Sequence, residues 1–106
     1  MSRTEAEFEM SELLDARARI PSDVVYRDFM HETVILNLGT GKYHGLNPTG
    51  GHMLRVLEST PLLRDAARFL ADDYGQPVER IEQDVCAFCL KLQERGLLAL
   101  ERDGDA

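Results

Sequence analysis

The stretch from residue 32 to residue 49, ETVILNLGTGKYHGLNPT, constrains the fold more than any other part of the chain. It holds two short runs of strand-forming residues, 32–38 and 42–46, separated by Gly39-Thr40-Gly41. Side chains of the first run alternate between two sets: Val34, Leu36 and Leu38, and Thr33, Ile35 and Asn37. This period of two, rich in β-branched residues, predicts a half-buried strand. The glycines allow the positive φ angles that a tight turn needs, so the stretch predicts a β-hairpin.

The second strand of this hairpin, residues 42–46, is expected to be the edge of a small sheet. If Leu36 and Leu38 face the core, Leu46 faces it as well. Gly45 weakens side-chain packing within the strand but allows another backbone to approach closely. No other segment of the sequence is expected to cover this strand, so we predict an edge that is open to another peptide.

The flanking segments complete an α+β pattern of three strands followed by three helices. Residues 23–29, DVVYRDF, favour a strand that precedes the hairpin. Asn47 is suited to cap a helix, and Pro48 is suited to its first turn. Thr60 is predicted to be the N-cap of a second helix.

A third helix is predicted from about residue 78 to residue 95, ending at Gly96. At about 100° per residue, one apolar stripe lies along it: Ile81, Val85, Phe88 and Leu92. Cys86, Ala87, Cys89 and Leu90 widen the apolar surface, and Asp84, Lys91 and Arg95 gather at one margin beside Phe88. A helix this apolar is either buried on two sides or lines a groove, and the pattern leaves both interpretations open.

Length and charge limit the class of protein. With 106 residues, one domain is expected. Residues 21–100 contain 11 acids and 8 bases, so no basic patch supports a nucleic-acid partner. No apolar run approaches the roughly 20 residues of a membrane helix, and the first residues lack the apolar core of a secretory signal. We therefore expect a cytoplasmic protein.

Charge-rich ends flank the expected domain. We expect residues 1–20 to form a flexible or weakly helical extension, residues 21–100 to form the domain, and residues 101–106 to be a disordered tail. Within the domain, residues 97–100 are apolar and could add a short strand.

Patterns that would indicate catalysis or metal binding are incomplete. Gly39–Lys42 resembles part of a phosphate loop, but the spacing of the full motif is missing. Cys86 and Cys89 have the spacing of a redox pair but lie in the middle of an apolar helix, where buried structural cysteines are expected. The three histidines do not show ligand spacing. We therefore predict no catalytic residues, no metal and no cofactor.

Two motifs of this chain resemble the PqqD family. The runs LNLGTGKYHGLNPTG and DVCAFCLKLQERGLL carry the resemblance, which extends over about residues 20–100. Members are small proteins of the RiPP recognition element type, which bind leader peptides of ribosomally synthesised precursors. The Thr-Gly hairpin is more similar to stand-alone members from lasso-peptide clusters than to the PQQ-biosynthesis member. Met53 departs from the large aromatic residue that is frequent in those relatives.

The resemblance implies a winged helix-turn-helix fold, with a three-stranded antiparallel sheet followed by three helices. It also implies that the leader peptide adds a strand beside the third strand and lies against the third helix. The implied docking edge consists of Lys42, Tyr43, His44, Gly45 and Leu46. The implied helix wall consists of Asp84, Val85, Phe88, Lys91 and Leu92.

The implied function is that of a non-enzymatic adaptor. Pockets between Tyr43 and Phe88 are expected to select apolar or aromatic leader residues, and Asp84 or Lys91 could fix the register by charge. The adaptor would present the leader to separate processing enzymes. These are a leader peptidase and a cyclase in a lasso-type cluster, or a radical SAM enzyme in other clusters.

The predicted fold and the open edge also allow two other interactions. A winged helix-turn-helix can bind DNA as a transcriptional regulator, and this is the alternative function. However, residues 78–95 carry four acids and three bases, and a duplex would repel that surface. An open strand edge could also pair with a second copy of the chain and form a homodimer.

Overall fold

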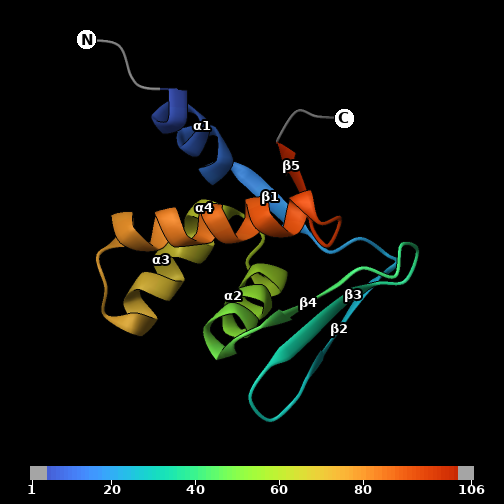
Figure 1. The fold of residues 1–106 in the computed structure, drawn as a ribbon. Coiled ribbons are helices and arrows are strands. Elements are labelled where there is room, and N and C mark those ends of the chain that lie inside the picture. The colour runs from blue at the N-terminus through green and yellow to red at the C-terminus, as the bar shows by residue number, and fades with distance from the viewer. Residues whose placement is uncertain (1–4, 103–106) are drawn as a thin grey trace.

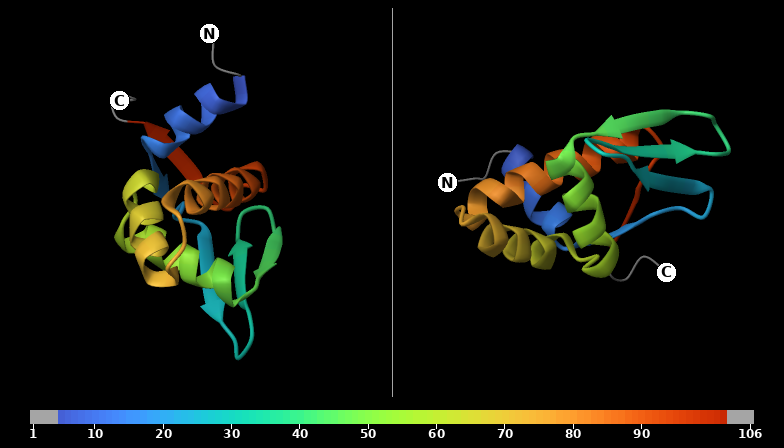
Figure 2. Two further views of the ribbon diagram at one scale, coloured as in Figure 1. Left: turned by 90° about the vertical axis from the view of Figure 1, so that its left-hand side faces the viewer. Right: turned by 90° about the horizontal axis from the view of Figure 1, so that it is seen from below.

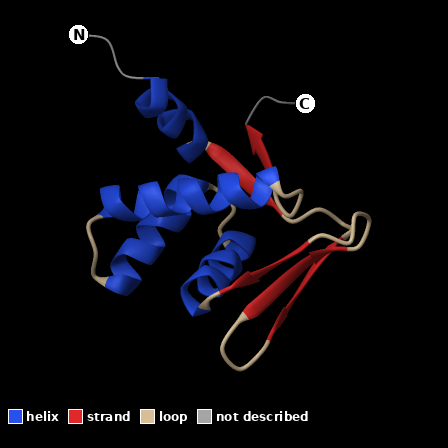
Figure 3. Ribbon diagram, viewed as in Figure 1, coloured by secondary structure: helices blue, strands red, loops and turns tan. Residues whose placement is uncertain are grey.

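The computed structural model describes residues 5–102 and shows the expected winged helix-turn-helix arrangement. Three strands, β2 (Val24–Asp28), β3 (Thr33–Asn37) and β4 (Tyr43–Leu46), form an antiparallel sheet in the order β2-β3-β4. Three helices follow: α2 (Pro48–Ser59), α3 (Leu63–Tyr74) and α4 (Val78–Glu94). The sheet extends away from the helices, and α2 lies between the sheet and α3 (Figures 1 and 3). Within residues 5–102, no helix is long and apolar enough to cross a membrane.

The two ends of the described chain form a second, smaller sheet. After α1 (Glu5–Leu14), β1 (Ala16–Arg19) pairs antiparallel with β5 (Ala99–Arg102). The expectation of a merely flexible or weakly helical segment before residue 21 is therefore wrong for β1. The expected boundary at residue 100 also cuts through a strand. Residues 103–106 of the expected tail lie outside the described residues.

Side-chain ion pairs and buried apolar groups attach this terminal sheet to the helices. Arg102 pairs with Glu12 at 2.8 Å, and Arg64 of α3 pairs with Asp15 at 3.0 Å. Leu14 and Ala16 are almost fully buried. The views in Figure 2 place β1 and β5 beside the helices, on a different part of the molecule from the three-stranded sheet.

The inner face of the three-stranded sheet, which faces α2, carries the less apolar set of β3 side chains. Thr33, Ile35 and Asn37 are buried, whereas Leu38 is 61% exposed. Leu46 pairs with Thr33 and is buried with it, so it does not share a face with Leu36 and Leu38. The predicted strand periodicity is confirmed, but the expectation that Leu46 shares a face with Leu36 and Leu38 is wrong.

Hydrogen bonds explain how polar β3 side chains can face inward. The Thr33 hydroxyl donates to Asp28 at 2.6 Å, and Asn37 Nδ2 donates to the carbonyl of Gly96 at 2.8 Å. Helix α2 also approaches the sheet closely at Gly51, where a Cβ would lie 2.4 Å from the Thr33 hydroxyl oxygen. A larger side chain at Gly51 or at Thr33 would push the helix away from the sheet.

The helix ends confirm most of the predicted start and stop signals. Asn47 Oδ1 accepts a hydrogen bond from the Gly50 amide at 2.8 Å, and Pro48 opens α2. Gly96 follows α4 with a φ of 72°, as its predicted role requires. Thr60 is not the N-cap of α3: it ends α2, and α3 is preceded by Leu62 without a side-chain cap.

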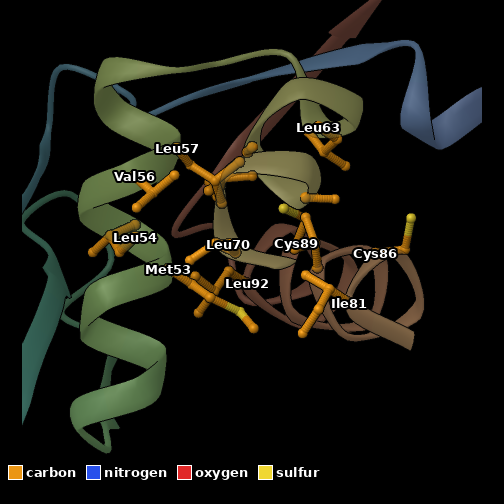
Figure 4. Packing of buried hydrophobic residues seen from close by; sticks show 14 of the residues in the cluster. Met53, Leu54, Val56, Leu57, Leu63, Leu70, Ile81, Cys86, Cys89 and Leu92 are labelled. Atoms are coloured by element: carbon orange, nitrogen blue, oxygen red, sulfur yellow. The ribbon is translucent and has the colours of Figure 1, made fainter. Parts of the chain in front are cut away.

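The core lies mainly between α2, α3 and α4, whose buried side chains point toward one another (Figure 4). Leu54, Leu57 and Leu70 are essentially inaccessible to solvent. Cys86 and Cys89 lie in this core as free thiols, in agreement with a structural role. Burial raises the pKa of Cys86 to about 11 and that of Cys89 to about 12, so both thiols are protonated near neutral pH.

Candidate functional site: an open strand edge beside helix α4

Strand β4 has one paired edge and one free edge. It pairs with β3 alone, and no residue within 5–102 forms a ladder with its other side. The Asn37 amide donates to the Lys42 carbonyl at 2.8 Å, which fixes the alternation of the ladder. His44 and Leu46 then bond to β3, while the main-chain groups of Tyr43 and Gly45 point toward the free edge. These groups could pair with an additional strand.

Helix α4 faces this edge across a groove of about 220 Å³, here called the β4–α4 groove. Six of the ten predicted residues line it together with two others: His44, Gly45, Leu46, Phe88, Lys91 and Leu92, with Asn47 and Gly50. The groove therefore joins the two predicted elements. A larger cavity of about 520 Å³ lies between α1, α4 and the terminal sheet, away from the β4 edge.

Four predicted residues do not line the groove. Tyr43 lies on the opposite face of β4 from His44 and Leu46 and is 70% exposed, so it forms no pocket with Phe88. Val85 is fully buried in the core. Lys42 precedes β4, and Asp84 is an exposed residue one helical turn before Phe88. His44 is the strand residue that faces Phe88, because side chains alternate along β4.

The corner between β4 and α2 supplies two groove residues that the sequence analysis missed. A Cβ at Gly50 would lie 3.4 Å from the Phe88 ring and 3.3 Å from Leu46 Cβ. The absence of a side chain thus lets the ring of Phe88 lie against the start of α2. Two consecutive glycines at the start of a helix were the available signal, because such a pair usually marks close packing.

Two cationic side chains lie close to His44 at the groove. Burial is the main cause that lowers the pKa of His44, and the neighbouring charges of Arg95 and Lys91 lower it further. His44 is therefore neutral near pH 7, while Lys91 and Arg95 contribute positive charge beside it. Arg95 was not predicted as a site residue, although the sequence placed it on the same margin of α4. Acidic side chains of a peptide would be attracted to this end of the groove.

Asn37 connects the hairpin turn to the end of α4. Its Oδ1 accepts hydrogen bonds from the amides of Gly39 and Thr40 at 2.8 and 3.0 Å, while its Nδ2 donates to Gly96. The asparagine is buried, and its three bonds join the hairpin turn to the residue that follows α4. It therefore holds the strand side and the helix side of the groove at a set separation.

The outer face of the sheet, turned away from α2, is unusually apolar. Val25, Leu36 and Tyr43 stand opposite one another on the three strands, and Leu38 continues this row at the hairpin turn. Val25, Leu38 and Tyr43 are exposed, and no element within residues 5–102 covers them. Apolar residues grouped in this way commonly mark protein-binding surfaces.

A family model and two solved structures match this chain. The family model described as "Coenzyme PQQ synthesis protein D (PqqD)" matches residues 32–98, which include β3, β4 and all of α2, α3 and α4. No curated protein sequence matches the chain.

Two solved structures share the fold. The first, "TbiB1 in Complex with the TbiA(beta) Leader Peptide", is 27% identical, with a TM-score of 0.69, and the match covers 83% of this chain and 98% of that one. The second, "Lasso peptide synthetase B1 complexed with the leader peptide", is 24% identical, with a TM-score of 0.71, and the match covers 78% of this chain and 98% of that one.

Proposed function

Because the chain belongs to the PqqD family, we propose that it is an adaptor that binds the leader peptide of a ribosomally synthesised precursor. The observation that carries this proposal is the free edge of β4 beside the β4–α4 groove. A similar protein of 27% identity has been solved with a leader peptide bound. The proposal assigns the chain no catalytic step and places it in the cytoplasm, where such precursors are made.

The leader would bind by adding a fourth strand to the sheet. Its main chain would pair with the outward-pointing amides and carbonyls of Tyr43 and Gly45. These bonds give affinity with little demand on sequence. Every second leader side chain would enter the groove and contact Phe88 and Leu92, so apolar residues are favoured there.

The charge of the groove supports selectivity for the leader. An acidic leader residue would be attracted to Lys91 and Arg95, and its approach would raise the lowered pKa of His44. The alternative of DNA binding gains no support from α4. Residues 78–95 include four acids and three bases, a balance that disfavours contact with a DNA duplex. The open edge of β4, in contrast, suits a peptide main chain.

We propose that the outer face of the sheet docks the processing enzyme. The groove and the outer face lie on opposite sides of β4, so a leader and an enzyme can be held at the same time. Tyr43, which does not enter the groove, would then serve the enzyme rather than the leader. In a lasso-type cluster the enzymes are a leader peptidase and a cyclase, and the adaptor raises the local concentration of their substrate.

A homodimer through the β4 edge would compete with the leader for the same main-chain groups. Added leader would therefore dissociate such a dimer, which sedimentation with and without peptide can measure.

Phe88 and Leu90 provide a matched pair of variants that tests the proposal. Both lie on α4, but Phe88 lines the groove whereas Leu90 is 43% exposed on another side and lines the cavity at the terminal sheet. Fluorescence anisotropy with the leader encoded beside this gene is expected to show affinity at least about tenfold weaker for Phe88→Ala, as for central interface aromatics. Leu90→Ala should bind as the unmodified protein does. Equal affinities for the two variants would contradict the proposed groove.

A further inference from the structure

The β2–β3 turn, residues 29–32, presents an uncompensated carboxylate at the free edge of β4. Gly45 has no side chain, and a Cβ there would lie 3.2 Å from Glu32 Oε2. Glu32 therefore extends over Gly45, on the face of β4 opposite the groove. Its carboxylate therefore lies beside Gly45, one of the two residues whose main-chain groups are proposed to pair with the leader.

A separate cavity of about 220 Å³ lies against the same turn, and Glu32 is part of its wall. Asp28, the second carboxylate of this cavity, already accepts hydrogen bonds from Thr33 at 2.6 Å and from Arg55 at 2.7 Å. Among the described residues, Glu32 makes no ion pair. The Glu32 carboxylate, which lies over Gly45, is therefore available to a bound peptide.

Apolar side chains border this charge. Met30 is 90% exposed and Phe29 is 60% exposed, and both line the cavity with Pro48. A long basic side chain fits such a surface, because its methylene groups can cover apolar residues while the charged end reaches a carboxylate. An acidic or short polar side chain would neither cover the apolar residues nor pair with the carboxylate.

Resting on the function proposed above, we infer that Glu32 is a specificity-determining residue that selects a lysine or arginine of the precursor peptide opposite Gly45. A strand added beside β4 would lie about 4.8 Å away, within reach of the Glu32 carboxylate. Its side chain opposite Gly45 points to the outer face, and its neighbours point into the groove.

The two faces of the added strand would therefore meet opposite charges. Lys91 and Arg95 act on the groove side, and Glu32 acts on the outer side. A leader with acidic residues on one face and a basic residue on the other matches both. A shift of one residue would exchange the faces, so this pattern also fixes the register of the peptide.

Selection from a random peptide library tests the inference without knowledge of the natural leader. An mRNA-displayed library is enriched on the unmodified protein, on Glu32→Lys, on Glu32→Gln and on Glu79→Lys. Glu79 is exposed in the first turn of α4 and lines neither the groove nor the cavity at the β2–β3 turn. Glu79→Lys is therefore the control, because it changes the net charge by the same amount as Glu32→Lys does. Fluorescence anisotropy then measures the affinity of the selected peptides for each protein.

We expect peptides selected by the unmodified protein and by Glu79→Lys to share a basic residue at a fixed spacing from an apolar one. Peptides selected by Glu32→Lys should carry an acidic residue at that position, and those from Glu32→Gln should show no preference. A lysine-containing peptide should bind Glu32→Lys about five- to tenfold more weakly, in line with an exposed ion pair that is reversed in sign.

The outcomes separate this inference from the proposed function. Identical preferences for the unmodified protein and Glu32→Lys, in peptides that still require Phe88, overturn the role of Glu32 and leave the groove intact. Failure of the unmodified protein to enrich any peptide overturns both.

Discussion

Single residues set the geometry of the β4–α4 groove, and Asn37 does so most directly. It makes three hydrogen bonds from a buried position, two within the hairpin turn and one to Gly96 beyond α4. The sequence showed only that Asn37 alternates with apolar residues. The partner of its amide lies 59 residues away, and local patterning contains no information about such a contact.

Replacement of Asn37 by alanine should therefore loosen both sides of the groove. We expect the free energy of unfolding to fall by about 2–3 kcal/mol, because three part-buried hydrogen bonds are lost. Thr40→Ala, which removes one exposed bond to the Lys42 amide, should cost less than about 1 kcal/mol. Urea unfolding measures both values. Equal losses would show that Asn37 does not link the two elements.

The core thiols give a prediction about pH. Burial raises the pKa of Cys86 to about 11 and of Cys89 to about 12, so the folded state binds these protons more tightly than the unfolded state does. Their contribution to stability is complete below the ordinary thiol pKa of 9.0 and is lost as pH rises toward 11 and 12. Urea unfolding over this range should show it, against a Cys86→Ala, Cys89→Ala double variant. Parallel pH profiles for the two proteins would contradict it.

Among the secondary-structure elements, β4 is proposed to bind the leader through the main-chain groups at its free edge. Tyr43→Pro removes an outward-pointing amide without breaking a bond to β3, whereas Tyr43→Ala keeps that amide and removes the same aromatic ring. We expect Tyr43→Pro to bind the leader about three- to tenfold more weakly than Tyr43→Ala, the range of one hydrogen bond. Isothermal titration calorimetry measures the difference. Identical affinities would mean that Tyr43 donates no main-chain bond to the leader.

The elements also show which parts of the fold the sequence could predict. Strands β2 to β4 and helices α2 and α4 have strong local signals, such as the Gly-Thr-Gly turn, Asn47 and Gly96, and the structure contains all of them. Which face of β3 is buried could not be predicted, because both faces carry apolar residues and the amide of Asn37 bonds to the distant Gly96. Strand β1 was missed because its sequence, ARAR, becomes a strand only by pairing with β5.

For the candidate site, too, the sequence predicted the elements but not the position of each side chain. The two facing elements follow from the open hairpin edge and the wide apolar surface of α4. That His44 rather than Tyr43 lines the groove depends on which face of β4 turns inward, and the burial of Val85 and the contribution of Gly50 depend on how the helix crosses the strand. That crossing is set by tertiary packing, which the pattern of either element alone does not contain.

At the scale of the whole molecule, the terminal sheet joins both ends of the described chain to the helices. Leu14 and Ala16 are almost fully buried, so the junction between α1 and β1 belongs to the core. Leu14→Ala should lower the free energy of unfolding by about 2–5 kcal/mol, as for other buried leucines. Leu38→Ala, at an exposed position, should change it by less than about 0.5 kcal/mol. Thermal unfolding measures both, and equal effects would mean that the segment is detached.

The molecule as a whole separates three tasks by location. The β4–α4 groove would hold the leader, the outer face of the sheet would dock an enzyme, and the terminal sheet stabilises the helical body. In this arrangement the leader binds by adding a strand to β4.

Amide hydrogen exchange, read by NMR on the isotope-labelled protein with and without the leader, tests that claim most directly. The account predicts that the amides of Tyr43 and Gly45 become strongly protected when leader is bound, while those of His44 and Leu46, already bonded to β3, change little. Alternating protection of this kind is specific to strand addition. Protection of the β2 edge instead, or leader binding that leaves Tyr43 and Gly45 exchanging freely, would contradict the account.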